Sequence, residues 1–227
     1  MKSYAGSTAK AARTFSACSE AVSSACGAKD INMKKQILGA LAGLLIAGAA
    51  QASGLGLRGM EHIGVTVPSI AEGKAFFEKV LGCEQAYALG PFKDEKGTWM
   101  TDNIGAHKSS VANIASLKCG NSTNIELFEF TSPSQNKASP KRDDVGAVSI
   151  GFYVDDINAA VAHLKKNNVK LLGDIKKVEE GPIAGRSWIY AETPWGLQIF
   201  FESDPNGIAY TKTPGAVKLF SPRNLPN

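Results

Sequence analysis

The chain has 227 residues, enough for one or two small domains with an adequate core, and its 44% hydrophobic and 20% charged residues are ordinary for a globular protein. Its formal net charge of +4 lies within residues 1–52, which hold six basic and two acidic residues, whereas the rest of the chain holds 19 of each. Because no lysine- and arginine-rich run with interleaved aromatic residues follows residue 52, the sequence argues against a nucleic-acid-binding protein.

Residues 33–52 have the pattern of a signal peptide. Two lysines are followed by an apolar stretch and then by Ala-Gln-Ala. The apolar stretch is short and rich in alanine and glycine, which disfavours a membrane span, and an uncleaved anchoring helix is the alternative. Residues 1–32 are interpreted as a non-native or disordered extension, with a transit peptide as the rival interpretation. The mature protein is therefore expected to be periplasmic or secreted, without a membrane contact after cleavage.

The first folded unit, residues 60–131, is predicted to have the order β-α-β-β-β. Residues 61–67 form a strand, and Ser69 with Glu72 forms a capping box for a helix that stops at Gly82. Further strands are predicted at residues 83–89, 110–118 and 124–130, with a long polar loop over residues 90–107.

Cys83 and Cys119 are the only cysteines after the leader. Cys83 opens one predicted strand and Cys119 ends the next one, so the two residues meet if these strands pair antiparallel. An exported protein with two cysteines is a candidate for one disulfide, with two free buried thiols as the alternative.

The second unit, residues 146–204, repeats the order of the first after a polar linker with two prolines at residues 131–145. Asp156 caps its helix, which follows a strand at residues 147–154. The remaining strands are predicted at residues 169–177, 187–192 and 197–202, and residues 205–227 form a C-terminal tail. The same order of elements in both units indicates two copies of one structural unit.

Four segments carry a resemblance to a known family: His62-Ile-Gly-Val-Thr-Val, Asn124-Ile-Glu-Leu-Phe-Glu, Gly151-Phe-Tyr-Val-Asp-Asp and Pro194-Trp-Gly-Leu-Gln-Ile-Phe-Phe-Glu. In this order the chain resembles the vicinal-oxygen-chelate superfamily of glyoxalase I, extradiol dioxygenases, methylmalonyl-CoA epimerase, and bleomycin and fosfomycin resistance proteins. The resemblance implies an α+β fold with two tandem β-α-β-β-β modules, whose curved mixed sheet surrounds a shared cup. It leaves open whether the modules pair within one chain or in a homodimer.

The resemblance also implies a reduced metal site. In this family the ligands come from the first and last strands of each module, and the matching positions are His62, Glu126, Ser149 and Phe200. His62 and Glu126 are candidate ligands for a divalent ion such as Zn, Ni, Mn or Fe, but serine is a poor ligand and phenylalanine is none. Glu126 is also the candidate catalytic base, with His62 as its hydrogen-bonding partner.

The candidate substrate-binding residues are Trp99, Met100, Ser149, Tyr190 and Phe200, although simple packing is the alternative for each apolar one. Glu202 lies two positions after Phe200 on the same face of its strand and is a candidate substitute for the missing carboxylate. Glu129 has the opposite parity to Glu126 and is expected to be solvated, as are His107 and His163.

Three functions follow from these patterns. The first is a glyoxalase-like enzyme that binds a small molecule, a lyase or isomerase of lactoylglutathione-lyase type with a reduced metal site. The second is a metal-free protein that sequesters a small molecule. The third is a ring-cleaving dioxygenase, which is disfavoured because it needs two histidines and one carboxylate on iron, and only one histidine is well placed.

Overall fold

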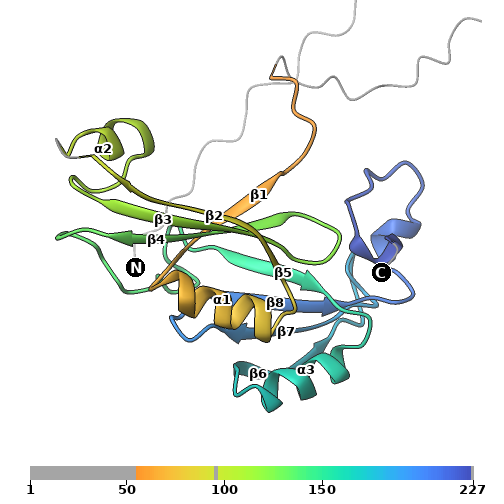
Figure 1. Ribbon diagram of the computed structural model, residues 1–227. Helices are drawn as coiled ribbons and strands as arrows, with labels where there is room; N and C mark the ends of the chain where they lie inside the picture. Colours follow the sequence, from red (N-terminus) through yellow and green to blue (C-terminus); the bar gives the residue numbers. More distant parts are fainter. Residues whose placement is uncertain (1–54, 95–96, 226–227) are drawn as a thin grey trace, which may run out of the picture. The chain divides into compact units, whose positions relative to one another are not determined.

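Two four-stranded mixed sheets, each accompanied by a helix from its own half of the chain, make up the computed structural model, which describes residues 55–94 and 97–225 (Figure 1). The predicted signal peptide and the extension before it lie outside the described residues. Residues from Arg58 onward form one compact unit. In the described part of the chain, no helix is long and apolar enough to cross a membrane.

The first sheet has the strand order β1-β4-β3-β2, with β1 parallel to β4 and the other pairs antiparallel. The elements of this module, in chain order, are β1 (His62–Val67), α1 (Ile70–Lys79), β2 (Glu84–Lys93), α2 (Trp99–Ile104), β3 (Val111–Lys118) and β4 (Asn124–Thr131).

The second sheet repeats this topology with the order β5-β8-β7-β6 and a parallel β5–β8 pair. Its elements are β5 (Ser149–Tyr153), α3 (Ile157–Lys166), β6 (Lys170–Lys177), β7 (Ser187–Glu192) and β8 (Gln198–Ser203), followed by short 3-10 helices at Ala209–Lys212 and Pro222–Asn224. The predicted α+β fold of two tandem β-α-β-β-β modules is confirmed.

Both long helices begin at a side-chain cap. The Ser69 hydroxyl accepts the main-chain N–H of Glu72 at 3.1 Å at the start of α1. Asp156 accepts the N–H groups of Asn158 and Ala159 at 2.8 and 3.1 Å at the start of α3. These bonds satisfy donors that have no partner inside the helix, which fixes where each helix starts.

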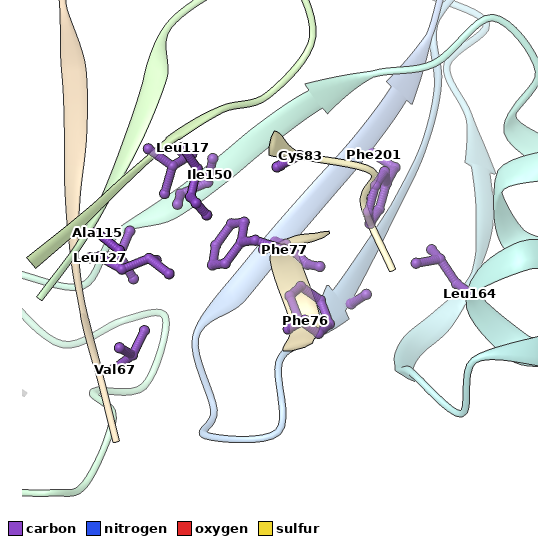
Figure 2. Packing of buried hydrophobic residues seen from close by; sticks show 14 of the residues in the cluster. Val67, Phe76, Phe77, Cys83, Ala115, Leu117, Leu127, Ile150, Leu164 and Phe201 are labelled. Atoms are coloured by element: carbon purple, nitrogen blue, oxygen red, sulfur yellow. The ribbon is translucent and has the colours of Figure 1, made fainter. Parts of the chain in front are cut away.

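One continuous core joins the two modules (Figure 2). Phe77 is fully buried at its centre, and Leu127 of the first sheet and Phe201 of the second belong to the same cluster. The ring of Phe76 packs edge-on against Trp195, which follows β7, with ring centroids 5.7 Å apart. His163 on α3 is exposed, as expected, and its Nε2 donates to the carbonyl oxygen of Val80 at 2.8 Å. Helix α1 therefore contacts both halves of the chain.

A disulfide joins Cys83 to Cys119, with Cα atoms 4.4 Å apart. Glu84 pairs with Lys118 in the antiparallel ladder of β2 and β3, so the next pair outward is the two cysteines. The bond ties the loop before β2 to the loop after β3.

The prediction of a loop over residues 90–107 is wrong at two places, because β2 extends to Lys93 and α2 forms at Trp99–Ile104. The Asp94 carboxylate accepts the N–H groups of Thr98 and Trp99 at 2.7 and 2.6 Å and so caps α2. A helix of this length is too short to show a hydrophobic period.

The expectation for Glu129 is also wrong. Its carboxylate is partly buried and accepts the main-chain N–H of Ile70 at 2.7 Å, at the start of α1. The alternation of side chains along β4 places Glu129 on the opposite face from Glu126, as predicted. It does not predict that the start of α1 lies over that face and supplies a hydrogen-bond donor to the carboxylate.

Candidate functional site

His62 and Glu126 meet on the face of the first sheet that does not form the core. His62 Nε2 lies 3.4 Å from Glu126 Oε2. In the register of β1 and β4, Glu126 is directly opposite Gly64, two residues after His62. His62 itself is opposite Asn124, so the imidazole reaches diagonally across the two strands to the carboxylate.

Ser116 completes this cluster from β3. It pairs with Glu126 in the β3–β4 ladder, and its hydroxyl donates to Glu126 Oε1 at 3.1 Å. The Ser116 residue is buried, and the Glu126 side chain is only 18% exposed. The carboxylate is therefore held by a donor on one oxygen and by the imidazole on the other.

Glu61 is a site residue that the sequence reasoning missed. Its carboxylate hydrogen-bonds to His62 Nδ1 and also accepts the side-chain amide of Asn124 at 3.3 Å. Neighbouring residues in a strand point to opposite faces. Because β1 begins only at His62, this alternation does not apply to Glu61, and its side chain can lie on the same side as His62. The sequence feature that could have identified Glu61 is its position directly before His62 at the start of the strand.

The two carboxylates favour the charged imidazole. The hydrogen bond that His62 donates to the Glu61 carboxylate is the main cause that raises the pKa of His62 above its ordinary 6.5. Burial opposes this rise to a smaller extent, and the negative charge of Glu126 also raises the pKa. The hydrogen bonds with His62 and Asn124 lower the pKa of Glu61. His62 is thereby set up as a proton donor beside a carboxylate that accepts protons.

A cavity of about 100 Å³ opens at this cluster, and the first module alone supplies its lining. Besides the cluster itself, the lining includes Ala86, Tyr87 and Lys118. Tyr87 is opposite Ser116 in the ladder of β2 and β3, and Leu89 is opposite Ile114 further along, and both side chains are half exposed. The cavity is thus small, and it lies beside exposed apolar side chains.

Comparison with known proteins places this site in a family. A family model described as the glyoxalase/bleomycin resistance protein/dioxygenase superfamily matches residues 61–190. The chain belongs to this superfamily. A 2-epi-5-epi-valiolone epimerase from an Actinomyces species is 36% identical over 164 residues, which cover 72% of this chain and 88% of the relative. The uncharacterized protein YaeR of Escherichia coli strain K12 is 28% identical over 145 residues, or 64% of this chain and 95% of that protein.

A solved structure agrees at the level of the fold. A glyoxalase family protein from Bacillus cereus superimposes with a TM-score of 0.51 and 22% identity, over 65% of this chain and 95% of its own. The likeness supports the tandem-module architecture alone.

Members of this superfamily often use divalent metals, and the donor set of this chain does not fit such a site. The described residues contain no group of three or more histidine, cysteine, aspartate or glutamate side chains arranged to hold a metal ion. His62 Nε2 and Glu126 offer two ligands, whereas Ser149 and Phe200 occupy the matching positions of the second module. Two protein ligands are fewer than the three or four that such ions take.

The second module carries an aromatic cluster where the sequence resemblance predicts metal ligands. The Phe200 ring packs in tilted contact against Tyr190 and Trp188, with ring centroids 4.8 and 5.8 Å away. The guanidinium carbon of Arg142, from the linker, lies 5.8 Å from the centre of the Tyr190 ring, within the range of a cation–π contact. Ser149 begins β5 and is partly exposed. None of these residues lines the cavity at His62 in this chain.

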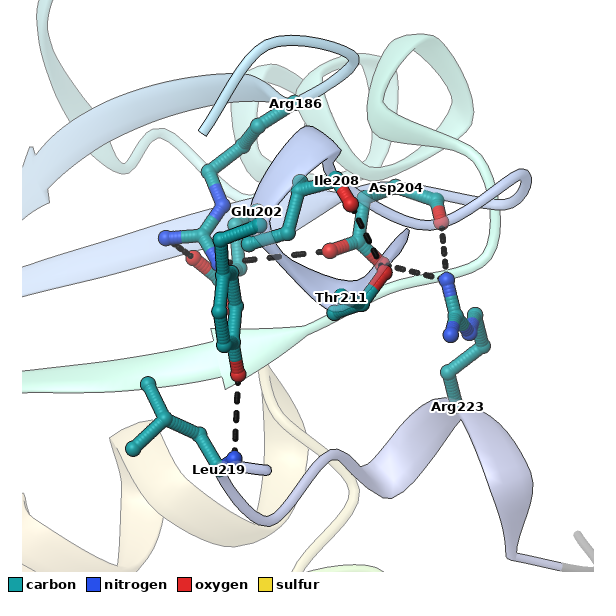
Figure 3. A network of polar contacts seen from close by, with 8 residues as sticks. Arg186, Glu202, Asp204, Ile208, Thr211, Leu219 and Arg223 are labelled. Carbon is teal, nitrogen blue, oxygen red and sulfur yellow. Dashed lines mark hydrogen bonds and ion pairs between the residues drawn. The ribbon is translucent and has the colours of Figure 1, made fainter. Parts of the chain in front are cut away.

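Glu202 does not substitute for the missing carboxylate in this arrangement. Its carboxylate is 2.8 Å from Arg186 Nη1, and Arg186 also approaches Asp204, which in turn binds Arg223 (Figure 3). Burial raises the pKa of Glu202, and the Arg186 charge opposes that rise in part. This network attaches the C-terminal segment to the end of β8.

The two candidates on α2 lie apart from the cavity at His62. Trp99 is 54% exposed at the start of the helix, and Met100 is buried at 2% exposure. Neither residue contributes to the cavity lining. His107, expected to be solvated, is exposed, and its carbonyl oxygen accepts the Ser110 hydroxyl.

Proposed function

We propose that this chain is an isomerase of the epimerase type, which moves a proton at a carbon next to a carbonyl group in a small molecule related to 2-epi-5-epi-valiolone. The contact between His62 and Glu126, with Ser116 behind it, carries this proposal, because it pairs a base with an acid in one small cavity. The named activity of the relative that is 36% identical supports the choice of epimerisation over other reactions of the superfamily.

In this reaction Glu126 is the general base. Its carboxylate takes the proton from the carbon next to the carbonyl, and the electron pair of the broken C–H bond moves into an enolate. Once Glu126 holds this proton, it no longer attracts the Nε2–H of the His62 imidazolium, and that N–H donates to the enolate oxygen and stabilises the developing charge. A proton delivered to the opposite face of the same carbon, from water or from the opposite wall of the site, gives the epimer. Glu126 then releases the proton that it took to solvent, which restores the site with no net oxidation or reduction.

A second copy of the chain is proposed to supply that opposite wall. Superfamily members bind small molecules and often form dimers. The cavity at His62 has no lining residue from the second module, while Tyr87 and Leu89 beside it are half exposed. The aromatic cluster of Trp188, Tyr190 and Phe200 from the second copy would cover it. Mixing Glu126→Gln with Tyr190→Ala chains tests this arrangement, because mixed dimers would regain an intact site and recover part of the activity, whereas sites within single chains would recover none.

The activity itself is tested with 2-epi-5-epi-valiolone in deuterated water. Proton NMR follows exchange at the carbon next to the carbonyl and formation of the epimer. Glu126→Gln is expected to abolish exchange, and the variant Glu78→Gln on α1, whose carboxylate pairs with Lys74 at 3.5 Å, is the control. An unchanged exchange rate in Glu126→Gln would refute the assignment.

The expected divalent ion stays a prediction, and no step above depends on it. Elemental analysis of the purified protein measures it directly. Activity that survives dialysis against a chelator would agree with the two-ligand donor set, and activity restored only by added Zn, Ni, Mn or Fe would show that a metal is used.

A metal-free sequestering protein is the second candidate. It is favoured by the aromatic cluster at Phe200 and Tyr190, because aromatic surfaces bind small molecules without any ligand to a metal. A thermal shift on adding the ketone, without any deuterium exchange, would favour this function over the epimerase.

We also propose a periplasmic or secreted location. The disulfide between Cys83 and Cys119 supports it, since disulfides persist in oxidising compartments. Cell fractionation with N-terminal sequencing tests it, and a mature chain that starts at Ser53 is the expected result.

A further inference from the structure

A second cavity, of about 640 Å³, has none of His62, Ser116 and Glu126 in its lining, although it shares Lys118 and Ile125 with the cavity at His62. It is lined by six consecutive residues, Ile150 to Asp155, which include the C-terminal part of β5 and the two residues after it. Side chains of consecutive strand residues point to opposite faces, so a cavity lined by all six follows the edge of the strand and not one face of the sheet.

That edge carries unpaired main-chain groups. In the second sheet β5 pairs only with β8, and among the described strands none pairs with its other edge. The N–H of Val154 donates to the carbonyl oxygen of Glu202 at 2.8 Å, so Val154 and the residues two apart from it point toward β8. The N–H and C=O groups of Gly151 and Tyr153 therefore point outward, along the cavity.

The walls of this cavity are held in place. The Cys83–Cys119 disulfide belongs to the lining and fixes the two loops of the first module that contribute to it. Arg223 also belongs to the lining, and its Nη1 donates to the main-chain oxygen of Asp204 at 2.9 Å (Figure 3). A preformed site costs little conformational entropy when it binds a partner.

The chemistry of the lining selects an uncharged, partly apolar partner. Ile63, Ile125 and Phe152 contribute apolar surface. The charged residues of the lining balance, with Glu84 and Asp155 against Lys118 and Arg223. A partner with a strong net charge would therefore gain nothing from the site as a whole.

We propose that this cavity binds an extended, uncharged peptide segment that adds a strand to the free edge of β5. Only a main chain offers donors and acceptors at the spacing of Gly151 and Tyr153, and its alternate side chains would lie against the apolar wall. The site is separate from the proposed epimerase cluster and does not depend on that activity.

The test uses a blocked peptide of five residues that alternate threonine and valine, titrated into the full chain labelled with ¹⁵N. Binding is expected to shift the amide signals of Gly151 and Tyr153 and to slow their hydrogen exchange. The same peptide with N-methyl groups at alternate residues lacks those donors, and it is expected to bind about tenfold more weakly, the order of effect of losing a single hydrogen bond.

A pair of variants provides the matched control. Gly151→Pro removes the outward N–H and leaves the hydrogen bonds to β8 intact, so peptide affinity is expected to fall at least about tenfold. Gly151→Ala keeps the N–H, and its added Cβ would meet only the Phe200 ring, at 3.6 Å, so affinity is expected to be unchanged.

Equal affinity for the N-methylated peptide, or amide shifts with naphthalene as large as those with the peptide, would identify a pocket for small apolar molecules and overturn the proposal. An absence of shifts at millimolar peptide would overturn it as well. The comparison of the two peptides decides the question even if Gly151→Pro does not fold.

Discussion

The Ser116 hydroxyl donates a hydrogen bond of 3.1 Å to Oε1 of Glu126, and this bond fixes the direction of the carboxylate that faces His62. Ser116→Ala removes the donor without adding bulk. Since a hydrogen bond to a charged group contributes about 1.5–3 kcal/mol, kcat/KM for epimerisation is expected to fall roughly 10–100-fold. Ser116→Thr keeps the hydroxyl and should recover part of that loss.

The measurement must separate positioning from loss of the fold. Urea unfolding of Ser116→Ala gives its stability, and the control Ser110→Ala removes a buried hydroxyl that binds the carbonyl oxygen of His107, away from the site. If both alanine variants lose activity in proportion to stability, Ser116 has no positioning role.

His62 is predicted to titrate above 6.5. The pKa of His62 is raised in the folded protein, chiefly by the hydrogen bond with Glu61, so the charged imidazole gains interactions on folding. The resulting contribution to stability is complete below the unfolded pKa of about 6.5 and is lost as the pH rises through the higher folded value. Proton NMR of the imidazole follows the titration directly.

Glu61→Gln is the informative variant for that titration. It is expected to lower the midpoint of His62 toward 6.5, while Glu78→Gln on the helix surface leaves the midpoint unchanged. A midpoint that does not respond to Glu61→Gln would show that the contact between the two side chains does not form in solution.

The contrast between Glu126 and Glu61 shows what a sequence of this kind can predict. Glu126 was identified from the resemblance to the superfamily, strand alternation between Ile125 and Leu127 agrees with it, and the structure brings it to His62. Glu61 lies just before β1, where alternation does not apply, so its side-chain direction depends on the tertiary position of Asn124. The module architecture was predictable for the same reason as Glu126, because short motifs recur in order.

The candidate residues on α2 show what the sequence could not predict. Trp99 and Met100 were proposed as substrate-binding residues from their residue type alone, and the start of their helix depends on the Asp94 side chain, five residues before Trp99. Residue type does not place a side chain relative to a cavity. The location of the 640 Å³ cavity along β5 was unpredictable for a related reason, since five separate segments and the C-terminal tail build its walls.

Removal of the disulfide is expected to destabilise the fold. Cys83 and Cys119 are 36 residues apart in sequence, and a cross-link of that span stabilises by about 2–4 kcal/mol, mainly by restricting the unfolded chain. The double variant Cys83→Ser/Cys119→Ser should lose that amount in urea unfolding. Reductant should destabilise the unaltered protein by a similar amount and leave the double variant unchanged, and a reductant effect on the double variant would point to another cause.

Gly73 on α1 is predicted to be a packing glycine, and Gly73→Ala should destabilise the protein. In an exposed helix this change stabilises by roughly 0.5–1 kcal/mol. Here an added Cβ would lie 2.9 Å from Leu127 Cδ1 and 3.2 Å from Val67 Cγ1, both buried in the core under the helix. Overpacking of this kind costs about 1–3 kcal/mol, so the net effect in urea unfolding is a loss. The double variant Gly73→Ala/Leu127→Val should recover part of the loss because it removes a methylene group close to the clash, and a stabilised Gly73→Ala would show that α1 lies further from β4 than the structure has it.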